Sequence, residues 1–258
     1  MNMKKNVWIT GASSGIGKTL ALKFAKEGWQ VAASARRENL LKELTTKNNN
    51  IFSYPLDVTD VERCKSVFNN ILKKFHHIDV CVFGTGMHDP KSEKKFNLEK
   101  IKEIMNVNYF GTMNSINSVY DYYSEKKNGH ISIISSVAGY RGLPSAGAYG
   151  ASKSALINFT ESLYFDMKLK NIKVSLINPG FIKTPMTDKN DFPMPFIKSP
   201  EFAAEEIYKG LVKKNNFEIH FPKVFTFFLK LLRIIPINIY FKILAKGLKN
   251  KVKSIKNN

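Results

Sequence analysis

Cysteine is scarce in this chain, whose 258 residues include only Cys64 and Cys81. Two cysteines cannot form a disulfide framework, and their surroundings lack the spacing of a metal site. We therefore expect neither a disulfide-rich secreted fold nor a bound metal ion. So low a cysteine content favours a reducing, intracellular setting, and we expect a cytoplasmic protein.

Long apolar runs are missing as well. No stretch reaches the ~18 uninterrupted apolar residues that a membrane-spanning helix needs. The nearest candidate, 224–245, is broken by Lys230, Arg233, Pro236 and Lys242. The N-terminus passes within a few residues into a strand pattern and a glycine loop, so we expect no signal peptide either.

Acidic residues are few, with 21 Asp and Glu against 40 Lys and Arg and a net charge of +19. Residues 223–258 hold nine of the basic residues and no acid. Such a segment suits an anionic partner, either a membrane surface or a nucleic acid, although a lysine-rich surface without a partner explains it equally well. Because no base-reading motif is present, we do not expect nucleic acid to be the partner.

The chain does contain a regular alternation of short apolar runs and longer helical patterns. Strands are expected at 7–10, 31–35, 51–56, 79–83, 130–135 and 174–178, and helices at 16–27, 38–46, 61–75, 97–124 and 147–169. This order predicts an α/β fold with a doubly wound parallel sheet (the Rossmann fold) in one domain, residues 1–222, with ligands at the carboxyl ends of the strands. Residues 223–258 are expected to form a basic, amphipathic helical extension.

A glycine-rich loop follows the first strand, in the order Thr10-Gly-Ala-Ser-Ser-Gly-Ile-Gly17. Gly11 permits a tight turn, Gly15 lets the backbone approach a pyrophosphate, and Gly17 allows the helix to pack closely on the strand. The loop therefore predicts dinucleotide binding at a helix N-terminus, to which Ser13, Ser14 and Ile16 also contribute.

The end of the second strand indicates which dinucleotide is bound. Positions 34–37 lack the acid that would bind a ribose 2′-hydroxyl, and they offer Arg36 and Arg37 to a 2′-phosphate instead. We therefore expect NADP in preference to NAD. Asp57, which precedes Val58 after the third strand, is expected to bind an adenine amino group, to cap the following turn, or to do both.

A second group of residues is suited to proton transfer. Tyr149 and Lys153 are four residues apart at the start of a predicted helix, so the phenol and the ammonium lie on one face. A nearby cation lowers the pKa of a phenol toward the working pH. Ser136 ends the preceding strand at the same edge of the sheet, where its hydroxyl can hold a carbonyl oxygen.

With these motifs the sequence resembles the short-chain dehydrogenase/reductase family, in its single-domain form, over about residues 5–222. The resemblance rests on six motifs in order: Thr10-Gly11-x3-Gly15-Ile16-Gly17, Asp57-Val58, Asn108 in Asn-Tyr-Phe-Gly111, Ser135-Ser136, Tyr149-x3-Lys153, and Asn178-Pro179-Gly180 followed by Thr184. It implies an NAD(P)-dependent oxidoreductase that acts on alcohols or carbonyls and assembles as a homodimer or homotetramer.

The resemblance also implies a role for each residue. Tyr149 is the general acid/base, Lys153 lowers its pKa and binds the nicotinamide ribose, and Ser136 orients and polarises the carbonyl. Asn108 holds a water in a proton relay through Lys153. Further cofactor contacts are expected from Gly84, Pro179, Gly180, Ile182 and Thr184.

One motif departs from the family pattern. Where the family usually has Asn-Asn-Ala-Gly after the fourth strand, this chain has Phe83-Gly84-Thr85-Gly86. The usual asparagines tie neighbouring strands together, so this segment needs other hydrogen bonds, and Thr85 can supply one. His88, just beyond the motif, is expected on the surface and not in the pocket.

Two segments near the C-terminus are rich in apolar residues. Segment 185–200 is expected to form an adaptable apolar lid over the substrate, because its Phe and Met side chains would be costly to expose. In 224–235 a helical wheel places Thr226, Lys230 and Arg233 opposite a broad apolar face made of Val224, Phe225, Phe227, Phe228, Leu231, Leu232 and Ile235. That face is expected either to lie on an anionic membrane or to cover the pocket or a sister subunit.

These features predict NADPH-dependent reduction of a carbonyl, or the reverse reaction, on a medium to large apolar, lipid-like substrate. Two alternatives stay open. One is an NAD-linked alcohol dehydrogenase, and the other is an NADP-binding interaction protein without turnover.

Overall fold

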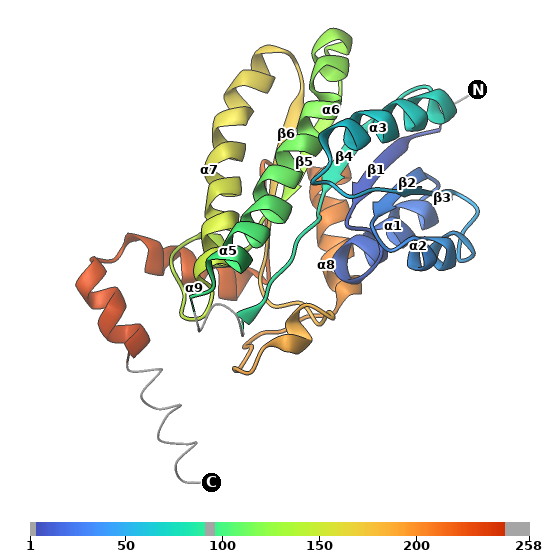
Figure 1. The fold of residues 1–258 in the computed structure, drawn as a ribbon. Helices are drawn as coiled ribbons and strands as arrows, with labels where there is room; N and C mark the ends of the chain where they lie inside the picture. The colour runs from blue at the N-terminus through green and yellow to red at the C-terminus, as the bar shows by residue number, and fades with distance from the viewer. Residues whose placement is uncertain (1–3, 91–95, 246–258) are drawn as a thin grey trace.

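The computed structural model of the chain describes residues 4–90 and 96–245. The end of the predicted basic extension, residues 246–258, therefore lies outside the described part. Figure 1 shows a central sheet with helices on both of its faces.

Seven parallel strands form the sheet in the order β3-β2-β1-β4-β5-β6-β7. They are β1 (Asn6–Thr10), β2 (Gln30–Ala35), β3 (Ile51–Pro55), β4 (Val80–Phe83), β5 (His130–Ile134), β6 (Lys173–Pro179) and β7 (Glu218–Phe221). The strand order reverses between β1 and β4, which opens a crevice at the carboxyl ends of these strands. The predicted α/β fold with a doubly wound parallel sheet is confirmed.

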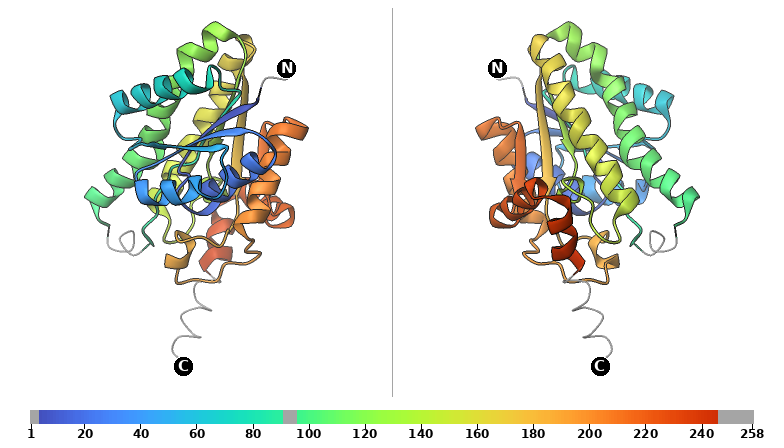
Figure 2. Two further views of the ribbon diagram at one scale, coloured as in Figure 1. Left: turned by 90° about the vertical axis from the view of Figure 1, so that its right-hand side faces the viewer. Right: turned by 90° about the vertical axis from the view of Figure 1, so that its left-hand side faces the viewer.

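Each face of the sheet is covered by its own set of helices (Figures 1 and 2). One face packs on α1 (Gly15–Lys26), α2 (Glu38–Thr45) and α8 (Pro200–Tyr208), and the other on α3 (Val61–Phe75), α6 (Gly111–Lys126) and α7 (Gly147–Leu169). Strand β1 shows why both faces are apolar: Val7 and Ile9 point into the first core and Trp8 into the second. A parallel sheet buried on both faces needs such continuous apolar strands.

The helix expected at 97–124 is present but is not uniform. It runs as α5 (Leu98–Met105), a π-helical segment Asn106–Phe110, and α6. Segments of this kind inside α-helices often occur at functional sites. Here the π-helical segment carries Asn108, which is fully buried.

Helix α8 and strand β7 were not expected from the sequence. In β7 the buried side chains Ile219 and Phe221 alternate with the half-buried, polar Glu218 and His220. Four residues of such alternation give too weak a signal to distinguish an edge strand from a loop. A second π-helical segment, Lys209–Lys214, connects α8 to the turn before β7.

After β7 the chain forms α9 (Lys223–Ile234) and, past Pro236, a further helical stretch at 237–245. Both stretches lie at the end of the molecule where the 181–199 loop lies (Figure 2). Among the described residues, no helix is both long enough and apolar enough to cross a membrane.

None of the described residues of α9 lines the pocket at the carboxyl ends of the strands. The residues that α9 buries are Phe225, Thr226 and Leu232, whereas Phe227 and Phe228 are exposed. The helix therefore packs on the domain by a mixed side, in which Phe225 and Leu232 lie beside Thr226, and it leaves much of its apolar face exposed.

Candidate active site

A cavity of about 280 Å³ lies at the carboxyl ends of the strands. Its walls contain all the residues predicted to bind the cofactor: Gly11, Ser13, Ser14, Gly15, Ile16, Gly17, Arg36, Arg37, Asp57, Val58, Gly84, Tyr149, Lys153, Pro179, Gly180, Ile182 and Thr184. They also contain residues that were not predicted to bind the cofactor: Ala35, Leu56, Thr85, Gly86, Val107, Ile134, Ser135, Pro185, Met186 and Thr187. The missed residues mostly adjoin predicted ones in the chain, so widening each motif by one or two positions would have found them.

The glycine loop has the close contacts for which glycine is needed. Gly11 has a φ of +74°, and a Cβ there would lie 2.6 Å from the Gly84 carbonyl oxygen. At Gly17 a Cβ would lie 2.3 Å from the Gly11 carbonyl oxygen, so the packing of α1 on the turn after β1 excludes any side chain. At Gly15, with a φ of +53°, a Cβ would approach Thr184 on the opposite wall of the cavity.

The N-terminus of α1 is free to receive an anion. The side chain of its N-cap residue, Ser14, makes no capping hydrogen bond, and the first turn contains no acid. The exposed N–H groups and the positive end of the helix dipole therefore face the cavity without a competing negative group.

Two arginines stand beside this loop. Arg37 donates hydrogen bonds from Nη2 to the hydroxyls of Ser13 and Ser14, both at 2.7 Å. Arg36 lies 3.8 Å from Asp57, measured between Nη1 and Oδ2. The two guanidiniums thus line the cavity where the second strand ends, and no acid replaces them there.

Asp57 caps the turn that follows β3. Its Oδ1 accepts hydrogen bonds from the Thr59 amide at 3.0 Å and from the Thr59 hydroxyl at 2.8 Å. The predicted capping role is therefore present. The other carboxylate oxygen faces Arg36.

The variant segment after β4 is tied to its neighbour by a residue other than the expected one. The Gly84 amide donates to the hydroxyl of Thr10 on β1, at 3.1 Å. The expectation that Thr85 supplies the missing bond is wrong, because its buried hydroxyl has no partner within the described residues. Since Thr85 also lines the cavity, this hydroxyl remains available to a bound molecule.

Tyr149, Lys153 and Ser136 come together on one wall of the cavity. The Lys153 ammonium lies 5.8 Å from the centre of the Tyr149 ring and donates to the Ile134 carbonyl oxygen at 2.9 Å. Burial lowers the pKa of Lys153 to about 8. Burial raises the pKa of Tyr149, and a hydrogen bond with Ser136 offsets part of that rise.

The position of Lys153 follows from the packing of α7 against β5. Ser135, the first residue after β5, donates from its hydroxyl to the Lys153 carbonyl oxygen at 2.7 Å. Gly139 makes this approach possible, since a Cβ there would lie 2.7 Å from the carbonyl carbon of Lys153. Ser136 accepts from the Ala138 amide, which fixes its hydroxyl at the cavity wall.

Asn108 is buried behind the cavity and is not part of its lining. Its side-chain oxygen accepts from the Met87 amide at 2.7 Å, and its nitrogen donates to the Met87 carbonyl oxygen at 3.0 Å. The same nitrogen donates to the Ser152 hydroxyl at 2.9 Å. Asn108 therefore clamps the loop after β4 against α7.

The expectation that His88 lies on the surface is wrong. Its side chain is 9% exposed, and its ring centre lies 4.6 Å from that of Tyr149. Burial lowers its pKa, which favours the neutral imidazole. His88 reaches this position because Asn108 holds the neighbouring Met87, a contact between residues 21 apart that no local pattern reveals.

The segment after β6 covers part of the cavity. The Thr187 hydroxyl accepts from the Thr184 amide at 2.9 Å and donates to the Ile182 carbonyl oxygen at 2.7 Å, which fixes the turn. The expected burial of the apolar side chains in 185–200 is only partial. Phe196 and Ile197 are 56% and 41% exposed, because the loop ends at the surface against α9.

This cavity suits a dinucleotide. The glycine loop, the uncapped N-terminus of α1 and the unpaired Thr85 hydroxyl suit a pyrophosphate and its sugars. Arg36 and Arg37 suit a phosphate on the adenosine ribose. The residues present therefore fit NADP.

Comparisons with known proteins agree on the family to which the chain is similar. The family described as short chain dehydrogenase matches residues 5–193. An uncharacterized oxidoreductase of Myxococcus xanthus is 34% identical over 218 residues, which cover 83% of this chain and 86% of that protein. The 3-oxoacyl-(acyl-carrier-protein) reductase FabG of Thermotoga maritima is 37% identical over 185 residues, which cover 70% of this chain and 75% of that protein.

A solved structure is similar over much the same part. ElxO with NADP bound matches with a TM-score of 0.76 at 31% identity, over 84% of this chain and 98% of that chain. Sequence motifs, strand order and relatives thus lead to one assignment: this chain belongs to the short-chain dehydrogenase family of oxidoreductases.

Proposed function

We propose that the protein catalyses the NADPH-dependent reduction of a carbonyl to an alcohol, or the reverse reaction, on a medium to large apolar substrate. The observation that carries this proposal is the meeting of Ser136, Tyr149 and Lys153 in the cavity that also holds the glycine loop and both arginines. A proton donor and a dinucleotide site in one cavity suit a carbonyl reductase. An NADP-binding interaction protein without turnover would use the dinucleotide site but would not need the proton donor beside it.

The three side chains divide the proton chemistry among them. Bound NADPH would supply the hydride for the carbonyl carbon. The Ser136 hydroxyl holds the carbonyl oxygen, and the Tyr149 phenol donates its proton to that oxygen. The Lys153 cation stabilises the phenolate that remains. Asn108 contributes by positioning, since it fixes the loop that presses His88 against Tyr149.

NADP is favoured over NAD by the residues at the end of β2. Arg36 and Arg37 can bind a 2′-phosphate, and no acid in this position competes for a 2′-hydroxyl. A relative of similar fold, ElxO, has a structure with NADP bound.

The apolar substrate is proposed from the segment beyond the nicotinamide turn. Met186 lines the cavity, and the half-buried Phe192 and Met194 follow in the same loop. Flexible Met and Phe side chains adapt to apolar chains of different shape. A relative named as a 3-oxoacyl reductase makes an acyl chain a reasonable candidate.

We also propose that residues 1–222 form the catalytic domain and that 223–258 form an extension to it. The domain is proposed to act in the cytoplasm as a homodimer or homotetramer. Both Cys64 and Cys81 are buried and free, as suits a reducing compartment. Light scattering coupled to size-exclusion chromatography measures the assembly directly.

Replacement of Tyr149 by Phe tests the proposed chemistry. Tyr149→Phe removes only the phenol oxygen, so we expect carbonyl reduction to fall by about 10²–10⁴-fold while NADPH still binds. Tyr164→Phe is the matched control, since Tyr164 lies on the same helix but outside the cavity. Turnover by Tyr149→Phe at the control's rate would contradict the assignment.

A further inference from the structure

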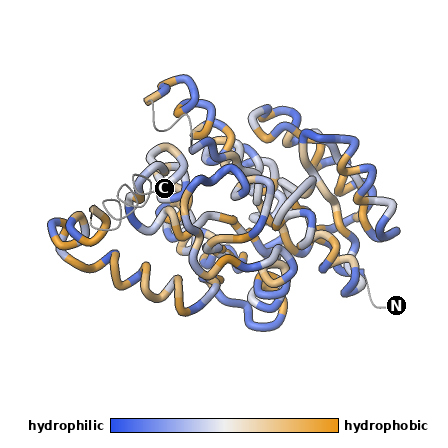
Figure 3. Tube along the Cα trace, turned by 90° about the horizontal axis from the view of Figure 1, so that it is seen from below, coloured by the Kyte–Doolittle hydropathy of each residue, from blue (hydrophilic) through white to orange (hydrophobic). Residues whose placement is uncertain are grey.

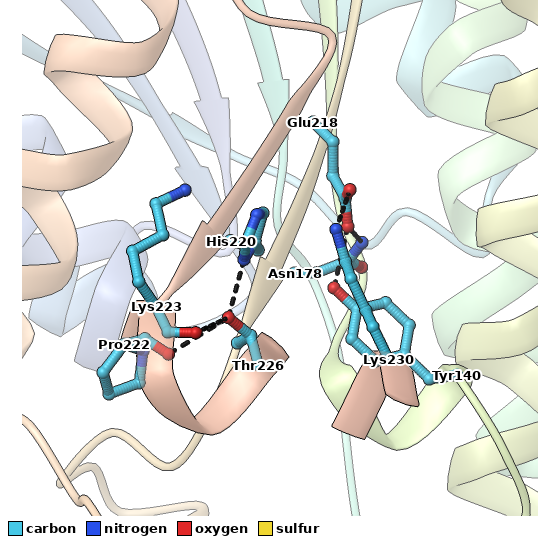
Figure 4. A network of polar contacts seen from close by, with 8 residues as sticks. All are labelled: Tyr140, Asn178, Glu218, His220, Pro222, Lys223, Thr226 and Lys230. Carbon is cyan, nitrogen blue, oxygen red and sulfur yellow. Dashed lines mark hydrogen bonds and ion pairs between the residues drawn. The ribbon is translucent and has the colours of Figure 1, made fainter. Parts of the chain in front are cut away.

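Helix α9 is held on the domain by the buried Phe225 and Leu232 and by a network of polar contacts beside them (Figure 4). The Thr226 hydroxyl lies 2.6 Å from Nδ1 of His220, and Lys230 forms an ion pair with Glu218. Glu218 also accepts from the Tyr140 hydroxyl at 2.7 Å and from the Asn178 side chain at 3.0 Å. This network faces the sheet, so it sets the rotation of α9 about its own axis.

The helical stretch at 237–245 is fixed to the same surface. Arg141 donates to the carbonyl oxygens of Leu232 and Ile235 at the end of α9, and its guanidinium lies 4.1 Å from the ring centre of Tyr240. The Tyr240 side chain is 2% exposed, and its hydroxyl donates to the Gly142 carbonyl oxygen. Both helices are therefore anchored in one orientation.

That orientation turns large apolar side chains outward. We call this set the C-terminal apolar surface; it consists of Phe196, Ile197, Val224, Phe227, Phe228, Leu231, Ile234, Ile237, Ile239, Phe241 and Ile243, which are 41–78% exposed. In Figure 3 the C-terminal helices form a largely hydrophobic arm at one side of the molecule. A contiguous exposed apolar surface marks a binding site, because water contact with it is unfavourable.

The charge around this surface identifies its partner. Residues 223–258 carry nine basic residues and no acid, and Lys223, Arg233 and Lys242 are exposed beside the apolar side chains. A second copy docked on this surface would bring two such segments together without any acid to offset them. An anionic lipid surface offers both an apolar interior and negative headgroups.

We propose that the C-terminal apolar surface docks the protein on an anionic bilayer, with α9 and 237–245 lying in the interface. The docked surface adjoins the cavity: Phe225 of α9 packs on Phe196 and Phe181, and Phe181 follows the cavity residue Gly180. Docking therefore brings the loop that follows the cavity residue Gly180 to the lipid, which suits entry of an apolar substrate.

Vesicle flotation with the full chain tests this docking. The wild type is expected to float with vesicles of phosphatidylcholine and phosphatidylglycerol, and much less with phosphatidylcholine alone. Phe227→Ser with Phe228→Ser should weaken binding by about tenfold or more, because apolar burial drives interfacial insertion. Arg233→Glu with Lys242→Glu should also weaken vesicle binding. Added salt should reduce the difference between this variant and the wild type, because salt screens the charges.

The matched control is Phe165→Ser with Leu169→Ser on α7, which removes two side chains that are 68% and 90% exposed but lie outside the surface. This control should bind vesicles like the wild type. Equal loss in the control, or no binding by the wild type at low salt, would overturn the proposal. So would concentration-dependent self-association in sedimentation velocity that Phe227→Ser with Phe228→Ser abolishes.

Different variants test the docking proposal and the proposed reaction, so one can be refuted without the other. Variants of the C-terminal apolar surface should keep their turnover of a short, water-soluble carbonyl, because none of the substituted residues lines the cavity. Tyr149→Phe, in contrast, should lose turnover and still float with anionic vesicles.

Discussion

At the scale of single residues, burial controls the chemistry of the cavity. It raises the pKa of Tyr149, which keeps the phenol protonated for donation, and lowers the pKa of Lys153 to about 8. Lys153 is therefore charged below about pH 8 and neutral above it. Its charge stabilises the phenolate only in the lower range.

Reductive turnover should accordingly depend on pH in one direction. We expect kcat/KM for NADPH, which reports groups of the free enzyme, to fall as the pH rises through about 8. Lys153→Arg keeps its charge at every accessible pH and should move this fall to a higher pH, whatever its absolute rate. A wild-type profile that stays flat from neutral to alkaline pH would refute the role of the Lys153 charge.

The arginines beside the glycine loop, Arg36 and Arg37, should make the protein bind NADPH more tightly than NADH. We expect Arg36→Ala with Arg37→Ala to weaken NADPH binding by about 10–100-fold more than NADH binding, since only NADPH carries the 2′-phosphate. Fluorescence titration with each nucleotide measures both constants. Lys18→Ala, a cation on α1 outside the cavity lining, is the control. Equal weakening of both nucleotides by the double variant would remove the argument for NADP.

Residues at this scale were predictable where chemistry depends on local spacing. The glycine loop, the pair Tyr149 and Lys153, and the arginines were all found from neighbours in the chain. His88 and the Thr10–Gly84 bond were not, because they depend on contacts between segments 21 and 74 residues apart. No periodicity in the sequence encodes such contacts.

At the scale of elements, α9 shows that a sequence pattern can predict a helix without predicting how that helix packs. The amphipathic helix was predictable from its spacing, but the side that it buries was not. Phe225 and Leu232 turn inward, as an apolar face usually does. Thr226 and Lys230 also turn toward His220 and Glu218 on the edge strand, and the rest of the apolar face is left exposed. Because β7 itself was missed, its two polar partners could not enter the prediction.

The ion pair between Lys230 and Glu218 should control how firmly α9 is held. Burial disfavours the Glu218 carboxylate, but hydrogen bonds from Lys230, Asn178 and Tyr140 outweigh it and lower its pKa. Lys230→Met leaves the half-buried Glu218 carboxylate without its cation. We expect this to lower the free energy that holds α9 on the domain by about 1–3 kcal/mol. We expect amide exchange in α9 to accelerate by about 10–100-fold, as followed by hydrogen–deuterium exchange.

The exposed Lys242 supplies the comparison for this measurement. Lys242→Met should leave exchange in α9 unchanged, because surface substitutions without partners have little effect on stability. Adding Glu218→Gln to Lys230→Met removes the uncompensated charge and should restore part of the protection. Identical exchange in Lys230→Met and Lys242→Met would show that the network does not anchor the helix.

At the scale of the whole molecule, the strand order creates the site. Reversal between β1 and β4 brings together loops that start at six different strands, so residues from Gly11 to Thr187 line one cavity. The fold could be predicted because parallel strands and their helices follow regular apolar patterns. The C-terminal helices lie at the end of the molecule where the 181–199 loop lies, and that loop borders the cavity (Figure 2).

The most direct test of this account is the rate of NADPH and NADH oxidation by the purified protein with aldehydes and ketones of increasing chain length. The account predicts turnover that prefers NADPH and rises with chain length, because the cavity continues into the apolar loop after β6. Tight NADPH binding without turnover of any carbonyl in the series, or of the matching alcohols in reverse, would contradict it.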